Sequence, residues 1–210
     1  MDYTRLYLVR HGQVIGHDEF RYNGQTDVDL TPLGKAQLEA MAEDLSQNNL
    51  SAIYCSDLKR TIYGAHLLAR AKGLEHRVES EFKELCFGEW EGLSPSEIEE
   101  RYPGELTARF RNIVDHQIPG GETIRDLWQR VGRRLRRLLA DHIGENVALI
   151  AHSGVNRVIL SQALGADIEL IRRLDQNYGC LNIIDYFPDG TAMLRLMNGP
   201  NRITNGLLHP

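Results

Sequence analysis

Short apolar runs typical of β-strands alternate along this chain with longer segments that have a helical pattern. The clear runs lie at residues 6–9, 52–55 and 147–151, and a weaker one contains Val78. The run at 147–151 is apolar at every position, as expected of a central parallel strand covered on both faces. An alternation of strands and helices favours an α/β fold, in which helices cross over between the strands of a mostly parallel sheet.

Capping signals place the first two helices. Thr31 followed by Pro32 is typical of an N-cap and a first helical residue, and it predicts a helix that continues to about residue 48. Ser56 or Asp57 is expected to cap a second helix, which Gly73 ends.

The second half of the chain is expected to add helices and a hairpin. Residues 94–143 have a mostly helical pattern, which the loop signals at 103–104 and 119–121 interrupt, so we expect a long helical excursion that acts as a lid. A helix is expected at 155–164. Two strand-like segments, 181–187 and 192–197, flank the turn 188–190 and predict an antiparallel hairpin joined to the sheet. Residues 1–210 contain no linker or repeat, so a single domain is expected.

Charge and composition argue against several classes of function. The chain has 24 Lys and Arg against 29 Asp and Glu, a net charge of −5, which disfavours a nucleic-acid partner. No apolar run approaches the ~20 residues of a membrane helix, and the N-terminal sequence does not resemble a signal peptide. Three cysteines without a CxxC motif predict neither a disulfide framework nor a zinc site. We therefore expect a cytoplasmic protein that does not bind membranes.

Histidines directly follow the first strand and the most apolar one. Arg10 and His11 come after residues 6–9, and His152 comes after 147–151. Ligands of open α/β sheets bind outside the carboxyl ends of the strands, so the two histidines are expected to converge. Arg60 falls in the first turn after the second strand, and its forked guanidinium suits phosphate or carboxylate oxygens. These residues predict a small cationic pocket on an acidic protein.

Several motifs in the same order resemble the histidine phosphatase superfamily, which has the phosphoglycerate mutase-like fold. The resemblance covers nearly the whole chain and rests on the segments LVRHG (8–12), NGQTD (23–27), LTPLG (30–34), YCSDLKRT (54–61), ELCFGEWEG (84–92), PGGE (119–122) and AHSG (151–154). RHG alone is weak evidence, whereas this many motifs in family order are strong. The resemblance implies a three-layer sandwich with a mostly parallel central sheet.

The resemblance also implies roles for the residues of the cationic pocket. His11 would be the nucleophile that forms a phosphohistidine, and Arg10, Arg60 and His152 would hold the phosphoryl oxygens together with it. Physical chemistry agrees, because nearby arginines disfavour a third positive charge and keep the attacking imidazole of His11 neutral. Arginines can balance the charge of the transition state, so neither a metal nor a cofactor is expected.

The same resemblance makes Glu84 the general acid, which protonates the leaving oxygen and then takes a proton from the attacking water. In the other major branch of the superfamily an Asp directly after the second histidine is the acid. Ser153 stands at that place here, which favours Glu84.

Two positions depart from the pattern of the family. Val14 stands where a Thr or Ser is common, and His17 stands where an Asn is common. A hydroxyl and an amide contact to phosphate are thereby removed. Main-chain amides around Gly24 and Gln25 are candidate replacements, and His17 is another.

The other conspicuous residues have ordinary interpretations. Surface or satisfied core positions are expected for the remaining histidines, which are His66, His76, His116, His142 and His209. Solvent is expected to surround the run of arginines 130, 133, 134, 136 and 137. Phe87 and Trp90 are interpreted as packing residues, Cys86 as a buried small residue, and Glu81, Glu89 and Glu91 as surface or loop carboxylates.

Three hypotheses for function follow. The first is a metal-independent phosphomonoester hydrolase of the histidine acid phosphatase type, which acts on a small phosphorylated metabolite. The chain resembles alpha-ribazole phosphatases and broad-specificity phosphatases. This resemblance makes alpha-ribazole 5'-phosphate a candidate substrate. The second is a cofactor-dependent phosphoglycerate mutase, which shares the same residues but typically has a C-terminal tail that guards the phosphohistidine, whereas residues 205–210 here read NGLLHP. The third is a noncatalytic phosphate-binding protein. The sequence does not predict an oligomeric state.

Overall fold

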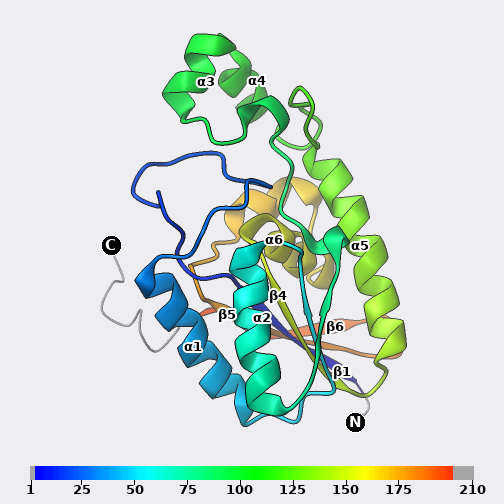
Figure 1. Cartoon of the computed structure of the whole chain (residues 1–210). Helices are drawn as coiled ribbons and strands as arrows, with labels where there is room; N and C mark the ends of the chain where they lie inside the picture. Colours follow the sequence, from blue (N-terminus) through cyan, green and yellow to red (C-terminus); the bar gives the residue numbers. More distant parts are fainter. Residues whose placement is uncertain (1–2, 201–210) are drawn as a thin grey trace.

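A single six-stranded sheet forms the centre of the protein (Figure 1), seen in a computed structural model that describes residues 3–200. The strand order is β3-β2-β4-β1-β5-β6. The strands are β1 (Thr4–Arg10), β2 (Ala52–Cys55), β3 (His76–Val78), β4 (Asn146–Ala151), β5 (Leu181–Tyr186) and β6 (Ala192–Gly199). Strands β1 to β4 run parallel to one another, and β5 and β6 form the antiparallel hairpin beside β1. The predicted α/β fold with a mostly parallel sheet is confirmed.

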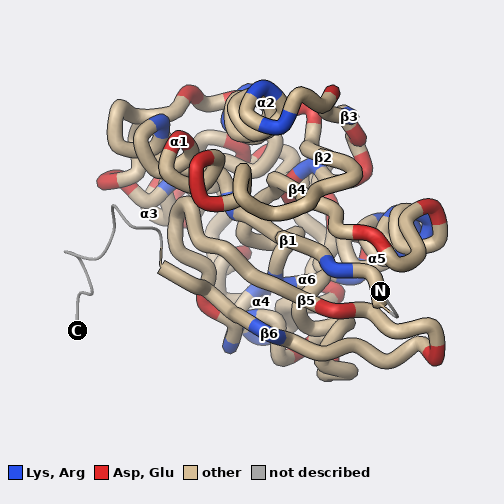
Figure 2. The backbone as a smooth tube through the Cα atoms, turned by 90° about the horizontal axis from the view of Figure 1, so that it is seen from below, with Lys and Arg blue, Asp and Glu red and all other residues tan. Residues whose placement is uncertain are grey.

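Helices cover both faces of this sheet and give three layers (Figure 2). Helices α1 (Pro32–Ser46) and α2 (Lys59–Lys72) pack on one face, and α5 (Ile124–Asp141) and α6 (Ser153–Ala163) pack on the other. Successive residues of β1 point to opposite faces, so Leu6 and Leu8 join the α5–α6 core while Tyr7 and Val9 join the α1–α2 core. Every residue of β4 is buried, as its apolar sequence predicts.

One predicted helix cap is confirmed and one is wrong. Thr31 caps α1, since its side chain accepts a hydrogen bond from the main-chain N–H of Gly34. The N-cap of α2 is Leu58, whose side chain makes no capping hydrogen bond, so the expectation for Ser56 or Asp57 fails. The Ser56 hydroxyl instead contacts Thr61 and His152. Gly73 ends α2 in the left-handed region, as predicted.

The helical excursion divides into two parts with different roles. Helices α3 (Pro95–Arg101) and α4 (Glu105–Arg111) stand apart from the sheet, at the top of Figure 1. Helix α5 instead packs along the sheet through Leu127, Val131 and their neighbours, so it belongs to the outer layer of the core. We call α3, α4 and the loop up to Thr123 the lid. Short 3₁₀ turns lie at Ser80–Phe82, Gly88–Trp90 and Ile168–Arg173.

Candidate active site

Residues His11 and His152 lie side by side because the strands that precede them are neighbours. Strands β1 and β4 pair in parallel with Arg10 opposite Ala151, so the next residue of each strand enters the same edge. The two imidazole rings have centroids 5.3 Å apart, and both side chains are buried. The expected convergence of the two histidines is therefore seen in the structure.

A single carbonyl group fixes the tautomer of His11. Its Nδ1 lies 2.7 Å from the main-chain oxygen of Gly12. A carbonyl oxygen only accepts hydrogen bonds, so Nδ1 carries the proton and Nε2 keeps its lone pair. Burial, followed by the charges of Arg60 and Arg10, holds the pKa of His11 well below 6.5. The imidazole is consequently neutral and ready to act as a nucleophile.

An aromatic ring and a main-chain oxygen position Arg10. Its guanidinium lies 3.9 Å from the centroid of the Tyr178 ring, and its Nη1 donates to the carbonyl oxygen of Gln176 at 2.5 Å. The Nε of Arg10 is buried and has no partner within the described residues. A buried N–H without an acceptor is costly, so this group is available for an oxyanion.

Helix α2 presents Arg60 from its first turn. The side chain is 1% exposed and donates to the carbonyl oxygens of Gly24 at 2.6 Å and Thr26 at 2.8 Å. These bonds tie the segment 23–27 to the pocket. Gly24 therefore contacts Arg60 through its carbonyl oxygen.

A serine hydroxyl positions the second histidine, His152. Its Nε2 lies 2.7 Å from the Ser56 hydroxyl, and its Nδ1 is buried without a partner within residues 3–200. Burial comes first, and the charge of Arg60 next, among the causes that hold the pKa of His152 well below 6.5. When the Ser56 hydroxyl donates to Nε2, the free Nδ1–H becomes a donor for a phosphoryl oxygen.

The Glu84 carboxylate is oriented by two main-chain N–H groups. Leu85 donates to Oε1 at 2.9 Å, and Gly154 donates to Oε2 at 3.0 Å. Gly154 belongs to the first turn of α6, directly after His152 and Ser153. A Cβ at residue 154 would collide with Glu84, so glycine allows this close approach. Glu84 therefore reaches the site from a segment far away in sequence.

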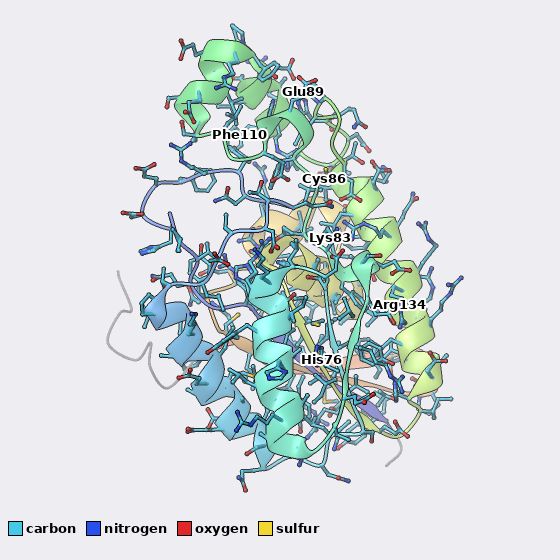
Figure 3. All side chains as sticks on the ribbon, viewed as in Figure 1. His76, Lys83, Cys86, Glu89, Phe110 and Arg134 are labelled. Atoms are coloured by element: carbon cyan, nitrogen blue, oxygen red, sulfur yellow. The ribbon has the colours of Figure 1, made fainter. Side chains whose placement is uncertain are left out.

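A cavity of about 640 Å³ joins these groups to the underside of the lid. Arg10, His11, Arg60 and Glu84 line it, and the buried His152 lies against His11. Figure 3 shows Lys83 and Cys86 on the segment that leads from β3 towards the lid, where Phe110 lies. The structure thus brings together five of the predicted site residues, Arg10, His11, Arg60, Glu84 and His152, whereas Gly24 and Gln25 do not line the cavity.

The two departures from the family pattern occupy different positions. Val14 is buried and forms a β-bridge with Leu30, and it lines the cavity. His17 is exposed and also lines the cavity. The main-chain N–H of Gln25 donates to Glu91 Oε1, so this amide already has a protein partner. The Gln25 side chain donates to the carbonyl oxygen of Glu84 at 3.0 Å and helps to position residues 79–92, which we call the acid segment after the proposed acid Glu84.

Sequence reasoning missed the residues that support the site. Glu91 is an organising carboxylate, which accepts from the main-chain N–H groups of Gln25, Thr26 and Phe87. It lies within the recognised motif at 84–92, but no local pattern separates it from its neighbour Glu89. Tyr178 is not singled out by the sequence, and Ser56 is expected only as a helix cap, because the contacts of both with the site are long-range.

The arginine run on α5 was interpreted wrongly in part. Arg130 donates to Glu122 with two nitrogens, at 2.8 and 2.7 Å, and to the carbonyl oxygens of Glu81 and Lys83. Arg134 pairs with Glu79. Both face the acid segment, whereas arginines 133, 136 and 137 are exposed as expected. Cys86 is partly exposed instead of buried, and Trp90 is fully buried as a packing residue.

The remaining histidines do not line the cavity. His142 is buried between Tyr54 and Glu145, and His116 pairs with Glu105. The rings of His66 and His76 pack edge-on, with centroids 6.1 Å apart. His209 and the tail 205–210 lie outside the described residues. Within residues 3–200, no group of three His, Cys, Asp or Glu side chains could hold a metal ion, and no helix is long and apolar enough to cross a bilayer.

Comparison with known proteins defines the class of this protein. Residues 6–199 match the histidine phosphatase superfamily, branch 1, so the chain belongs to this family. Related proteins of Mycobacterium bovis and Mycobacterium tuberculosis, one of them described as a bifunctional protein, are 34% identical over 196 residues. That alignment covers 93% of this chain and 54% of theirs, so the chain spans about half the length of these relatives.

Further relatives match along most of their length. Phosphoserine phosphatase 1 of Hydrogenobacter thermophilus is 32% identical over 179 residues, which are 85% of this chain and 83% of that protein. Among solved structures, the alpha-ribazole phosphatase of Shigella flexneri superposes with a TM-score of 0.84 at 27% identity, covering 93% of this chain and 96% of that one. A mycobacterial glucosyl-3-phosphoglycerate phosphatase gives a TM-score of 0.84 at 26% identity, covering 94% and 100%. These matches agree with the three-layer fold described above.

Proposed function

We propose that this chain is a metal-independent phosphomonoester hydrolase that acts through a phosphohistidine at His11. The observation that carries the proposal is the geometry of this imidazole, whose Nδ1 is bound to the Gly12 carbonyl so that Nε2 keeps its lone pair, while burial and the charges of Arg60 and Arg10 hold its pKa well below 6.5. Relatives named as phosphatases support it. We further expect a small phosphorylated metabolite as substrate, a cytoplasmic location, and a single domain over the whole chain.

Each group has one task in the proposed reaction. Nε2 of His11 attacks phosphorus, the bond between phosphorus and the alcohol oxygen breaks, and Glu84 gives its proton to that oxygen. Arg10, Arg60 and the Nδ1–H of His152 bind the equatorial oxygens, where negative charge is spread in the transition state. A water molecule then attacks the phosphohistidine and gives a proton to Glu84. The products are the alcohol and inorganic phosphate, and His11 is restored.

Hydrolysis of 4-nitrophenyl phosphate in the presence of a chelator tests the proposal. The wild-type chain should release nitrophenol and form an acid-labile phosphoenzyme on His11, while His11→Ala should do neither. Loss of activity on chelation that a divalent ion restores would overturn the metal-independent mechanism. Binding of phosphate or vanadate without any turnover would favour a noncatalytic phosphate-binding protein.

The mutase hypothesis remains the second candidate, because phosphoglycerate mutase-like protein 4 of Arabidopsis thaliana is 30% identical over 188 residues, 88% of this chain and 82% of that protein. A panel that includes alpha-ribazole 5'-phosphate and phosphoglycerates separates the candidates. A hydrolase releases inorganic phosphate, whereas a mutase yields the isomerised ester. The best substrate of the panel would also test alpha-ribazole 5'-phosphate as the specific candidate.

A further inference from the structure

Three buried amide side chains connect α6 and β5 to the segment that holds Arg10. They are Asn156 of α6, Gln176 in the segment 174–180 that leads into β5, and Asn182 of β5, and none is more than 2% exposed. We call these three residues the amide cluster. Burial of an amide is costly unless its hydrogen bonds are satisfied, and the proposed reaction uses none of the three side chains. Their place in the core therefore needs an explanation.

Main-chain groups fix the orientation of the Asn182 amide. Its Nδ2 donates to the carbonyl oxygen of Leu8 at 3.1 Å, and its Oδ1 accepts from the main-chain N–H of Asn198 at 2.8 Å. A carbonyl oxygen only accepts and an N–H only donates, so this amide cannot be turned over. Asn182 consequently presents its second N–H and its oxygen to Gln176 in a fixed arrangement.

The Gln176 amide matches this arrangement with a reciprocal pair of hydrogen bonds. Its Nε2 donates to Asn182 Oδ1 at 2.9 Å, and its Oε1 accepts from Asn182 Nδ2 at 2.8 Å. The other hydrogen of Nε2 goes to the carbonyl oxygen of Asp175 at 2.8 Å, and Asn156 Nδ2 donates to Oε1 at 3.0 Å. Both hydrogens of Nε2 are thus used, and the Gln176 side chain is held in one orientation.

The main chain of Gln176 carries the acceptor that positions Arg10. Nη1 of Arg10 donates to the Gln176 carbonyl oxygen at 2.5 Å, and the ring of Tyr178, two residues further on, has its centroid 3.9 Å from the guanidinium. The Nε of Arg10 is buried without a partner in residues 3–200 and is the group that remains for phosphate. The amide cluster therefore anchors the segment that supplies both supports of this guanidinium.

The amide cluster also contacts the helix that follows the second histidine. The main-chain N–H of Asn156 donates to the carbonyl oxygen of His152 at 2.8 Å, in the first turn of α6. Strands β1 and β5 are neighbours in the sheet (Figure 2), and Asn182 bonds to β1 through Leu8. One set of hydrogen bonds thus joins the strand that ends in Arg10 to the helix that begins after His152.

We propose that Gln176 is a positioning residue for Arg10, which the amide cluster orients towards the phosphoryl group. This inference rests on the proposed function, in which Arg10 binds phosphate. A fully satisfied buried network holds a single arrangement, which apolar side chains of the same size would not specify. The acceptor for Arg10 is a main-chain oxygen and survives any substitution of Gln176. A change of this side chain consequently alters only where the acceptor lies.

The test replaces the Gln176 amide with an apolar side chain of similar size. Gln176→Met should lower kcat/KM for 4-nitrophenyl phosphate by about 10- to 100-fold, since misplacement of a group by about 1 Å can cost up to about 10²-fold. It should also weaken binding of inorganic phosphate by about tenfold, as expected for a charge-assisted hydrogen bond. The dependence of Tm on phosphate concentration measures this binding without any turnover.

Asn146→Leu is the matched control. Asn146 is a buried amide at the first residue of β4, far from the end that precedes His152, and it donates to the carbonyl oxygen of Asn49 at 2.9 Å. This variant also loses a buried amide and should be less stable. It should keep the phosphate affinity and the kcat/KM of the wild type.

A cycle with Arg10→Met separates positioning from general damage. If Gln176 acts through Arg10, Gln176→Met should add no further loss of phosphate binding or kcat/KM once Arg10 is replaced. Asn156→Leu removes one hydrogen bond to Gln176 and should give a smaller loss that also requires Arg10. This second variant decides the question if Gln176→Met does not fold.

Two outcomes contradict the proposal. One is a double variant in which the losses from Gln176→Met or Asn156→Leu multiply with that from Arg10→Met. The other is a folded Gln176→Met with the phosphate affinity and kcat/KM of the wild type. A wild type that binds phosphate but hydrolyses no ester would overturn the proposed hydrolase function, while the binding cycle would still test Gln176. A wild type that neither binds phosphate nor hydrolyses any ester would overturn both.

Discussion

Glu84 and Gly154 are joined by a hydrogen bond of 3.0 Å, from the main-chain N–H of Gly154 to Glu84 Oε2. The bond links the segment after β3 to the first turn of α6, which also follows His152. It therefore fixes the position of the proposed acid relative to His152, which we propose binds phosphate. A side chain at position 154 would occupy the place of the carboxylate.

Replacement of the acid gives the first prediction. Glu84→Gln should slow hydrolysis of alkyl phosphates by about 10²-fold or more, because general acid catalysis typically contributes that much. Nitrophenyl phosphate should be slowed far less, since nitrophenolate leaves readily without a proton. Burst and steady-state rates should be measured separately, because the same carboxylate activates water in the second step. Equal slowing of the first step for both leaving groups would point to another acid, with Glu89 the first candidate.

The contact with Gly154 gives the second prediction. Gly154→Ala should displace the Glu84 carboxylate without touching the nucleophile, and misplacement by about 1 Å can cost up to about 10²-fold in rate. The loss should again be larger for alkyl than for nitrophenyl phosphates, and vanadate should still bind. The measurement is the ratio of the hydrolysis rates of alkyl and nitrophenyl phosphates, which is compared between Gly154→Ala and Glu84→Gln. A Gly154→Ala variant that is folded and has the wild-type ratio would contradict the link between the two residues.

The sequence predicts the sheet and the proposed phosphate-binding residues better than the residues that support them. Strand ends are local features, so Arg10, His11 and His152 follow from short apolar runs and their neighbours. Arg130 is different, because its role depends on carbonyl groups almost fifty residues away. A basic residue on an amphipathic helix looks the same in sequence whether it meets solvent or a folded loop.

The lid is a second example of packing that local sequence patterns do not reveal. Its helices have clear local signals, such as Ser94 with Glu97 as a capping box at the start of α3. The loop signal at 119–121 falls directly before α5, but the helical pattern alone does not show that α5 packs on the sheet while α3 and α4 stand apart from it.

The depressed pKa values of His11 and His152 give a third prediction, on stability. The unfolded chain titrates these residues near a pKa of about 6.5, while burial and nearby cations hold both pKa values well below that in the folded chain. Between these values the unfolded state binds more protons, so the free energy of unfolding falls as the pH decreases below about 7, by up to about 1.4 kcal/mol per pH unit for each histidine. Above that range both states are neutral and the contribution vanishes.

Urea unfolding between pH 5.5 and 8.5 measures this dependence. Below pH 7, the free energy of unfolding of His152→Gln should fall less steeply with decreasing pH, because one of the two histidines with a depressed pKa is gone. Other titrating groups are common to both proteins and cancel in the difference. Identical slopes in the wild type and His152→Gln would show that burial of this histidine does not oppose its protonation.

The last prediction concerns Arg130, whose guanidinium holds the acid segment on both sides of Glu84. It binds the carbonyl oxygens of Glu81 and Lys83, while its partner Glu122 accepts from the main-chain N–H of Cys86. Arg130→Met keeps an unbranched apolar stem but removes the guanidinium, which leaves Glu122 and the two carbonyl groups without this donor. The free energy of unfolding should fall by about 2 kcal/mol, and alkyl phosphates should be hydrolysed more slowly because Glu84 loses its support.

Arg133→Met is the matched control for that change. Arg133 lies on the same helix but is exposed, so its loss should change the stability by less than about 0.5 kcal/mol and leave turnover intact. Glu122→Gln and the double variant complete a cycle with Arg130→Met, and the pair should be strongly non-additive because both side chains hold the same segment. Additive effects, or equal behaviour of Arg130→Met and Arg133→Met, would mean that solvent replaces these bonds at no cost and that the acid segment keeps its position by packing of Phe82 and Leu85 alone.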